Sequence, residues 1–392
     1  MAVNKSGGNR IDSGTVFTGS KTTISLWGNV VNVKGENMKN RTFSLLLCIS
    51  MAFVFVFGFG CAPATDANQQ SSVNLSEEYL LLNNDTPSLN HFDKSVIVSE
   101  PGFASTNEDR LLETFKNGHR IMFVDTTPEE VSSTLHLSNQ SVNHIDANDE
   151  YLGSMAYQCD NYDVVVGVYV EDTDDMDMVS RAIENAMEYD FGELMQTKST
   201  SDAWPEVNTH SNTYTFSGFT VNTAMKLMLS PNNPTDNGQR SQVALYNVDI
   251  VNVKDSYLIS TADFDIAVGK GSIVDYSPSI SHAKADANIS ITYPWGIGFS
   301  FSTKTDVDVS IVSGGIAHKN ITLRYTPTSI LSIPIPTSDD ICSRMSVESY
   351  STNAGTAHSA AGTFTIKYQL SSDPFSTETV SRSMGVAGHD SQ

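Results

Sequence analysis

The chain has 392 residues, with 23 Lys and Arg against 45 Asp and Glu, and a formal net charge of −22 at pH 7. A surface this acidic repels phosphate backbones, which argues against nucleic acid as a partner. The sequence contains no nucleophile elbow, zinc-protease motif, phosphate-binding loop or dinucleotide fingerprint, and its histidines are scattered singly. We therefore expect no enzyme, no cofactor and no metal.

The N-terminal part has the layout of a signal peptide. Residues 1–37 show no periodic apolar pattern, whereas Met38 opens a basic stretch that is followed by an apolar run from Phe43 to Phe59. The run is shorter than the ~20 apolar residues of a transmembrane helix. We expect residues 1–60 to be an upstream segment and signal peptide with its true start at Met38, and the rest to be exported. Residues 1–60 hold six Lys and Arg and two Asp and Glu, which leaves 17 basic and 43 acidic residues, a net charge of −26.

The end of the apolar run bears on localisation. Gly60-Cys61 resembles the cleavage site of bacterial lipoproteins, which implies lipid attachment at Cys61. The mature protein would then be extracellular or anchored by lipid at the cell surface, with a polar linker over residues 61–91.

Residues 92–195 alternate between strand and helix patterns. Thr127, Pro128 and Glu130 form a capping-box signature at the start of one helix. The order favours a small, largely parallel sheet. The predicted strands are 95–99, 120–125 and 164–170, and the predicted helices are 108–117, the one opened by Thr127, and 176–188.

The acidic run from Asp172 to Asp177 has two interpretations. Its spacing suggests a cation loop, but it lacks the Gly and the Glu that a calcium-binding loop of the helix-loop-helix type requires. Carboxylates around the N-terminus of the following helix, where the helix dipole favours negative charge, are the better interpretation.

Helix patterns end after residue 195. We expect a linker over residues 196–212, an antiparallel β domain over 213–378 and a loose tail over 379–392, because short strand patterns are separated by turn signals. One disulfide between Cys159 and Cys342 is compatible with export but is not required. The predicted strands are 214–219, 221–229, 242–248, 257–259, 264–268, 321–325 and 364–370, in addition to a hairpin.

The hairpin is the strongest pattern in the chain and extends from Ala287 to Ile311. Its odd-numbered residues from 287 to 301 are Ala, Ile, Ile, Tyr, Trp, Ile, Phe and Phe, and the even-numbered ones are polar or Gly apart from Pro294. Period two is the side-chain period of a strand. A run of 25 residues is too long for one strand of a compact domain, so it must fold back. A three-residue loop keeps the apolar residues on one face. Pro294-Trp295-Gly296 fits this loop, and Thr303-Lys304-Thr305 is the alternative.

Such a ribbon suits a membrane-crossing β-barrel, in which strands of ~9–11 residues alternate apolar and polar positions. One hairpin cannot cross alone, because its edge amides would face hydrocarbon unpaired. Several chains would each have to contribute a hairpin. The predicted lipid face is Ile289, Ile291, Tyr293, Trp295, Ile297, Phe299 and Phe301. The predicted lumen face is Ser290, Ser300, Ser302, Lys304 and Asp306.

A short motif precedes the hairpin. Asp275-Tyr276-Ser277-Pro278 resembles the Asp-Tyr-(Ala/Ser)-Pro segment before the stem of leukocidin/haemolysin-type β-barrel pore-forming toxins. Cytolysins of the Vibrio type in that family also carry a small pro-region, to which residues 92–195 are similar in place. The resemblance implies a protein that oligomerises and inserts its stem into a membrane.

Together these patterns predict an α+β fold, with a small N-terminal α/β domain followed by an antiparallel all-β sandwich-like domain with a long amphipathic hairpin. The functional prediction is an exported pore-forming protein whose partners are copies of itself and a lipid membrane. The alternative is a non-enzymatic cell-surface β-sandwich module that binds an unknown surface ligand, with the hairpin as ordinary core.

Overall fold

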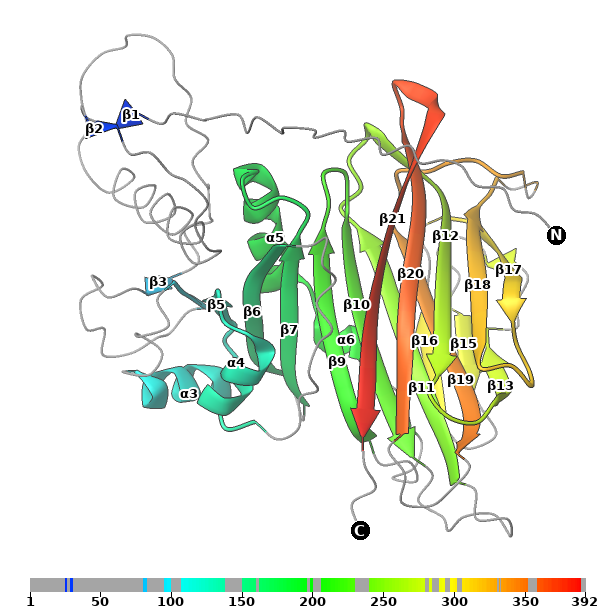
Figure 1. The fold of residues 1–392 in the computed structure, drawn as a ribbon, viewed down its shortest axis with the longest axis horizontal. Coiled ribbons are helices and arrows are strands. Elements are labelled where there is room, and N and C mark those ends of the chain that lie inside the picture. The colour runs from blue at the N-terminus through cyan, green and yellow to red at the C-terminus, as the bar shows by residue number, and fades with distance from the viewer. Residues whose placement is uncertain are drawn as a thin grey trace, which may run out of the picture. The chain divides into compact units, whose positions relative to one another are not determined.

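The structure is a computed structural model (Figure 1). It describes residues 25–26, 29–30, 80–82, 95–99, 107–137, 150–159, 162–195, 198–199, 206–229, 240–278, 282–283, 289–292, 297–301, 305–329, 331, 333–351 and 358–388. The chain divides into two compact units, Met1–Ser44 and Leu45–Gln392. In the first unit, β1 (Ser25–Leu26) pairs antiparallel with β2 (Asn29–Val30). Met38, the apolar run and Cys61 lie outside the described residues.

The second unit contains a ten-stranded sheet that passes through both of the predicted domains. Its β3, β4 and β5 are parallel, β5 to β7 are antiparallel, β7 is parallel to β9, and the remaining pairs are antiparallel. In spatial order the strands are β13 (Ile273–Ser277), β19 (Ile341–Ser351), β11 (Arg240–Val251), β10 (Thr220–Leu229), β9 (Glu206–Thr215), β7 (Tyr162–Val170), β6 (Glu150–Cys159), β5 (Ile121–Val124), β4 (Val96–Val98) and β3 (Leu80–Leu82).

Four helices cover the N-terminal strands of this sheet. They are α3 (Glu108–Lys116), α4 (Pro128–Thr134), α5 (Met176–Glu188) and α6 (Phe191–Met195). Val165 packs with α3 and α4 in one core cluster, whereas Val164 and Val166 pack with α5 and α6 in another. Because neighbouring residues of a strand point to opposite faces, the two helix pairs lie on opposite faces of β7.

The helix starts follow from local hydrogen bonds that the sequence predicts. The Thr127 hydroxyl accepts from Glu130 N at 3.3 Å, and the Glu130 carboxylate accepts from Thr127 N at 2.9 Å, which completes the capping box. Asp175 accepts from the backbone N–H groups of Asp177 and Met178, so it caps α5. The acidic run therefore serves a helix N-terminus.

A six-stranded antiparallel sheet packs against the C-terminal strands of the large sheet. In spatial order it consists of β14 (His282–Ala283), β17 (Val307–Gly314), β18 (Asn320–Pro327), β12 (Tyr257–Val268), β20 (His358–Leu370) and β21 (Asp373–Gly388). These two sheets form the sandwich that the sequence predicts.

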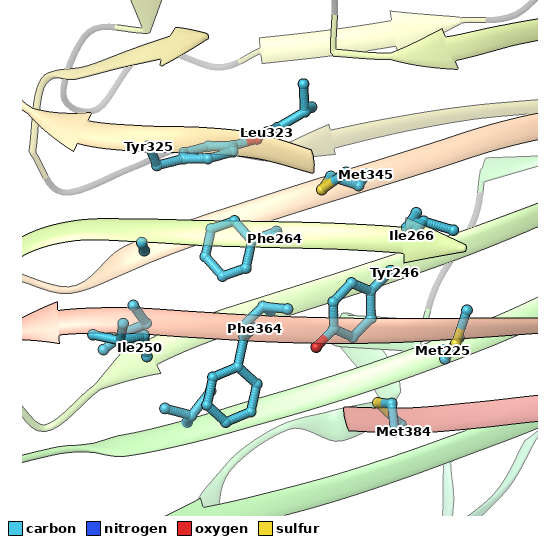
Figure 2. Packing of buried hydrophobic residues seen from close by; sticks show 14 of the residues in the cluster. Met225, Tyr246, Ile250, Phe264, Ile266, Leu323, Tyr325, Met345, Phe364 and Met384 are labelled. Atoms are coloured by element: carbon cyan, nitrogen blue, oxygen red, sulfur yellow. The ribbon is translucent and has the colours of Figure 1, made fainter. Parts of the chain in front are cut away.

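The sandwich interior is a single apolar cluster to which both sheets contribute (Figure 2). Tyr246 of the large sheet and Phe264 and Phe364 of the smaller one are almost completely buried. A Cβ atom on Gly362 would lie 2.6 Å from the Tyr246 ring, so a glycine at this position lets the ring pass close to β20. Burial of these aromatic side chains is a major source of stability.

Several expectations need correction. The first sheet is mixed rather than largely parallel, because β6 and β7 form an antiparallel hairpin. Residues 206–212, expected in a linker, belong to β9. The tail predicted as loose is strand as far as residue 388, since β21 pairs along β20. Cys159 and Cys342 are both half-buried and form no disulfide with each other.

A buried histidine gives the sandwich a pH-dependent contact. His210 on β9 is 5% exposed, and its ring nitrogens lie 3.1 Å from the Gly385 carbonyl of β21 and 3.1 Å from Asn212 Oδ1. Burial lowers the pKa of His210 to about 4, against the opposing hydrogen bond to Gly385. The folded protein therefore favours the neutral ring, whereas the unfolded chain takes up a proton below its ordinary pKa of 6.5.

Stability should consequently fall as the pH drops from 6.5 towards 4, with a His210 contribution of roughly 3 kcal/mol. Urea unfolding of the wild type and of His210→Gln at pH 7, 5.5 and 4.5 measures it. The variant should lose less stability on acidification than the wild type. The same substitution at exposed His318 should leave the wild-type slope unchanged, and equal slopes for all three proteins would contradict the prediction.

Candidate functional site

The hairpin has the register that the three-residue loop requires. β15 (Ile289–Thr292) pairs antiparallel with β16 (Ile297–Phe301) through Ile289↔Phe301 to Thr292↔Gly298, so every pair of residue numbers adds to 590. Odd-numbered residues thus pair with odd-numbered ones, and the turn falls between Thr292 and Ile297. The alternative turn at residues 303–305 is not the one formed.

The base of the hairpin continues the same register in the six-stranded sheet. There His282 pairs with Asp308 and Ala283 with Val307, and these numbers also add to 590. The stretches between the two paired regions, 284–288 and 302–306, therefore contain five residues each. The two arms have equal length, and the sandwich holds both of them at their base.

A third strand pairs with the hairpin. β8 (Lys198–Ser199) runs antiparallel to β16, with Ser199 opposite Ile297 and Lys198 opposite Gly298. The resulting sheet has the order β15-β16-β8 and is separate from the two large sheets, although β16 also lies near β19. Its third strand comes from the segment that follows α6.

The predicted stem residues are placed in part. Of the lipid-face set, Ile289, Ile291, Ile297, Phe299 and Phe301 lie in β15 and β16, and the register pairs Ile291 with Phe299. Of the lumen set, Ser290 pairs with Ser300, and Asp306 accepts a backbone hydrogen bond from Thr328 at 2.8 Å. Tyr293, Trp295, Ser302 and Lys304 lie outside the described residues. The assignment of the two faces to lipid and lumen stays a prediction.

The motif before the hairpin has a structural place. Asp275, Tyr276 and Ser277 belong to β13 at the edge of the large sheet and pair with β19, and Pro278 follows directly. The Asp275 carboxylate accepts from Tyr276 N at 2.8 Å, and Tyr276 packs partly against the sandwich core. The motif thus anchors the chain four residues before the hairpin base begins.

An apolar surface next to the hairpin base was missed by the sequence interpretation. Leu331, Ile333 and Ile335 in the connection from β18 to β19 are 79%, 53% and 50% exposed. Ile335 N donates to the Pro327 carbonyl at 2.9 Å, and Pro327 pairs with Val307 at the base of the second arm. The Ile-Pro-Ile-Pro sequence predicts an extended connection here, because its prolines prevent regular strand pairing, but it does not show that the apolar side chains are exposed.

The turn between β20 and β21 lies at the same end of the six-stranded sheet as the connection from β18 to β19 (Figure 1). Tyr257 at the start of β12 pairs with Leu370 at the end of β20, and Ile259 bridges to Thr337 of the apolar connection. Phe375, just beyond this turn, is 97% exposed. We call Leu331, Ile333, Ile335 and Phe375 the apolar end.

A second exposed apolar group lies elsewhere. Ile311, Val312 and Ile316 are in the distal part of β17 and the turn after it, away from the pairing at Val307. Exposure alone therefore does not select a functional surface. The distinguishing feature of the apolar end is its hydrogen-bonded contact with the hairpin base.

Other signals give no second site. Burial raises the pKa values of Tyr151, Tyr157 and Tyr189, all in the N-terminal half of the large sheet or the helices beside it. Within the described part of the chain, no three His, Cys, Asp or Glu residues are grouped so that they could hold a metal ion. No helix in that part is long and apolar enough to cross a membrane.

Comparisons with known proteins do not assign a family. No family model matches the chain, and no curated protein matches it. Among solved structures, a pore-forming protein has 10% identity and a TM-score of 0.32, over 46% of this chain and 94% of that one. The Clostridium perfringens NetB toxin in its membrane-inserted form has 7% identity and a TM-score of 0.28, over 47% and 99%. The collagen-binding subdomain of the Enterococcus faecalis surface protein ACE has 10% identity and a TM-score of 0.21, over 37% and 86%. TM-scores this low do not establish a shared fold.

The register itself can be tested. Paired residues of antiparallel strands lie ~4.5–5.5 Å apart between their Cα atoms, within the range that a disulfide spans. The variant Ser290→Cys with Ser300→Cys should therefore form an intramolecular disulfide under mild oxidation, as mass spectrometry of the unreduced protein would show. The combination Ser290→Cys with Phe299→Cys is shifted by one residue and should form little. Equal yields from the two variants would refute the register.

Proposed function

We propose that this chain is an exported, non-enzymatic pore-forming protein that contributes residues 282–308 as a hairpin to an oligomeric β-barrel in a membrane. The observation that carries the proposal is the register common to the hairpin and its base. Cys61 is the proposed lipid attachment site.

The arms have the length that a membrane crossing needs. If the register is kept beyond the pairs at the base, each arm has ten residues, 284–293 and 297–306. At ~3.3 Å per residue an arm extends for roughly 33 Å, and a tilt of ~45° leaves a height of roughly 23 Å. Membrane-crossing strands have ~9–11 residues at this tilt, so arms of this length suffice.

The two faces suit the two environments of a barrel wall. In the inserted ribbon all charged residues of both arms would be even-numbered, whereas the odd-numbered face would be apolar apart from Thr303 and Thr305. Transmembrane barrels place apolar side chains towards lipid and polar ones towards the lumen. Since backbone groups cannot remain unpaired in hydrocarbon, the barrel must close, and closure requires several copies of the chain.

The apolar end supports a membrane partner. Leu331 and Ile333 expose apolar area in the connection that is hydrogen-bonded to the hairpin base, and Phe375 exposes more on β21, the other edge strand of the same sheet. The acidic composition argues against attraction to anionic lipids, so the contact would rest on apolar burial. Zwitterionic lipid should therefore suffice for binding.

The alternative function is a cell-surface binding module with a permanent hairpin. The proximity of β16 to β19 favours it, because a hairpin fixed on the large sheet would be part of the soluble fold. The two functions predict different results for a charge placed on the odd-numbered face, and the next experiment separates them.

Phe301→Arg should slow release of dye from liposomes strongly while the soluble protein still folds. An Arg on the lipid face near the bilayer midplane costs about 2–4 kcal/mol for each hairpin, so we expect at least a tenfold slower release. The neighbouring Ser300→Arg would face the lumen and should release dye within about threefold of wild type.

Circular dichroism and thermal unfolding of both variants give the second readout. If Phe301→Arg unfolds the soluble protein, the binding-module alternative gains support, because an unpaired charge is costly in a core. A wild type that releases no dye under any lipid or salt condition would remove the proposed function.

Substitution of the apolar end should weaken membrane binding. Burial of one Leu or Ile side chain contributes about 1.5–3 kcal/mol, so Leu331→Ser with Ile333→Ser should reduce binding to phosphatidylcholine vesicles at least tenfold in a flotation assay. The control is Ile311→Ser with Val312→Ser, which removes two exposed apolar residues of β17 and should bind normally. Equal effects of both pairs would contradict a specific role of the apolar end.

A further inference from the structure

β16 is paired along both of its edges, with two different parts of the chain. β16 lies between β15 of the same hairpin and β8, and both neighbours run antiparallel to it. In a closed barrel of hairpins, the position of β8 would belong to β15 of the next copy, which also runs antiparallel. A strand edge holds one partner at a time, so the two pairings exclude each other.

We propose that β8 covers the edge of β16 on which a second copy of this chain pairs, and that release of this short segment frees that edge for assembly. The inference rests on the proposed pore-forming function.

The α/β region itself is bound too firmly to be the part that leaves. β7 pairs with β9 from Val166↔Ser211 to Val170↔Thr215, and the rings of Tyr169 and Tyr214 stack with centroids 5.0 Å apart. Removing residues 92–195 would strip β7 from β9 in the middle of the ten-stranded sheet.

A buried polar cluster fixes the same region to the sandwich. Asp249 on β11 is paired with Arg344 on β19, and Tyr189 at the end of α5 donates a hydrogen bond to the same carboxylate. Asp249 is buried, so removal of Tyr189 would leave its carboxylate without one of its hydrogen bonds in a site shielded from water. This cluster makes the helices beside β7 a lasting part of the large sheet.

β8, in contrast, is held to β16 by few contacts and can separate from it. It has two residues and two residue pairs with β16, and residues 197–202 around it are Thr, Lys, Ser, Thr, Ser and Asp. No apolar residue of this stretch has to leave a core when β8 moves. The hairpin base remains held by the pairing of β14 with β17, so the arms can swing out without unfolding the sandwich.

A reversible cross-link tests the proposal in the full chain with its four native cysteines replaced by serine. Ser199→Cys with Ile297→Cys joins β8 to β16, and Lys198→Cys with Gly298→Cys joins the adjacent pair. The matched control is Thr363→Cys with Ser383→Cys, which joins β20 to β21, where the two side-chain oxygens are 2.8 Å apart. Oxidation of either β8 pair should slow dye release from phosphatidylcholine vesicles at least tenfold, and reduction should restore it. The control should release dye equally in both states.

Hydrogen–deuterium exchange provides a readout that does not depend on pore formation. Ser199→Pro removes an N–H and disturbs the β8 pairing, so amides of residues 289–301 should exchange at least tenfold faster, with β20 and β21 unchanged. Unaltered exchange in the hairpin, or full dye release by the oxidised β8 pairs, would overturn the proposal. If the wild type releases no dye while hairpin exchange rises in Ser199→Pro, the proposed pore-forming function is rejected. The proposal that β8 covers the edge of β16 is then retained.

Discussion

Every backbone amide of a strand that enters a membrane must keep a partner, and this constraint connects the hairpin, its base and β8. At the base, His282 and Ala283 pair with Asp308 and Val307 in the six-stranded sheet. Further along, β16 is paired on both edges. A transition to a barrel would exchange one of these partners for an equivalent strand from another copy and keep the other two sets of pairs. The pairs at the base and within the hairpin could therefore persist through such a transition.

The sandwich can support such a transition because its stability rests on other residues. Phe264, Tyr325 and Phe364 are almost completely buried between the two large sheets, and the Phe264 and Tyr325 rings meet edge to face with centroids 5.1 Å apart. On the outer face of the six-stranded sheet, Arg324 forms two hydrogen bonds of 2.6 Å with Asp263 of the neighbouring strand. These contacts tie β12, β18 and β20 together independently of the hairpin.

The sequence predicted those parts of the fold that depend on near neighbours along the chain. Thr127 and Glu130 predict the start of α4, because a capping box is complete within four residues. The parity of the hairpin is equally local, since one turn decides it. β19 escaped prediction because Arg344 and Glu348 interrupt its apolar pattern. Both are accommodated by residues far away in sequence, Asp249 and Ser241.

The same limit applies to the candidate site. The alternation of Ile289 to Phe301 reveals an amphipathic ribbon, but only strand pairing shows that its base shares the register and that β8 occupies its outer edge. The sequence around Leu331 and Ile333 likewise predicts only a connection between strands. The hydrogen bond from Ile335 to Pro327 shows that this connection lies beside the hairpin base. β21 was missed for a related reason. Only Val380, Met384 and Val386 of this strand are buried apolar residues, so most of its support comes from pairing with β20.

An exposed strand edge is a hazard in any soluble protein, because it invites pairing with whatever chain arrives first. A long permanent neighbour would remove the hazard for β16, but it would also prevent assembly. A two-residue strand between α6 and β9 meets both demands, since it occupies the edge and yet forms few bonds. In the chain β8 lies between α6, which packs on the large sheet, and β9, which belongs to it, so β8 would remain close after release and could return to the edge when no second copy has taken it. Under the proposed function, the edge on which a second copy would pair is in this way covered until that copy is present.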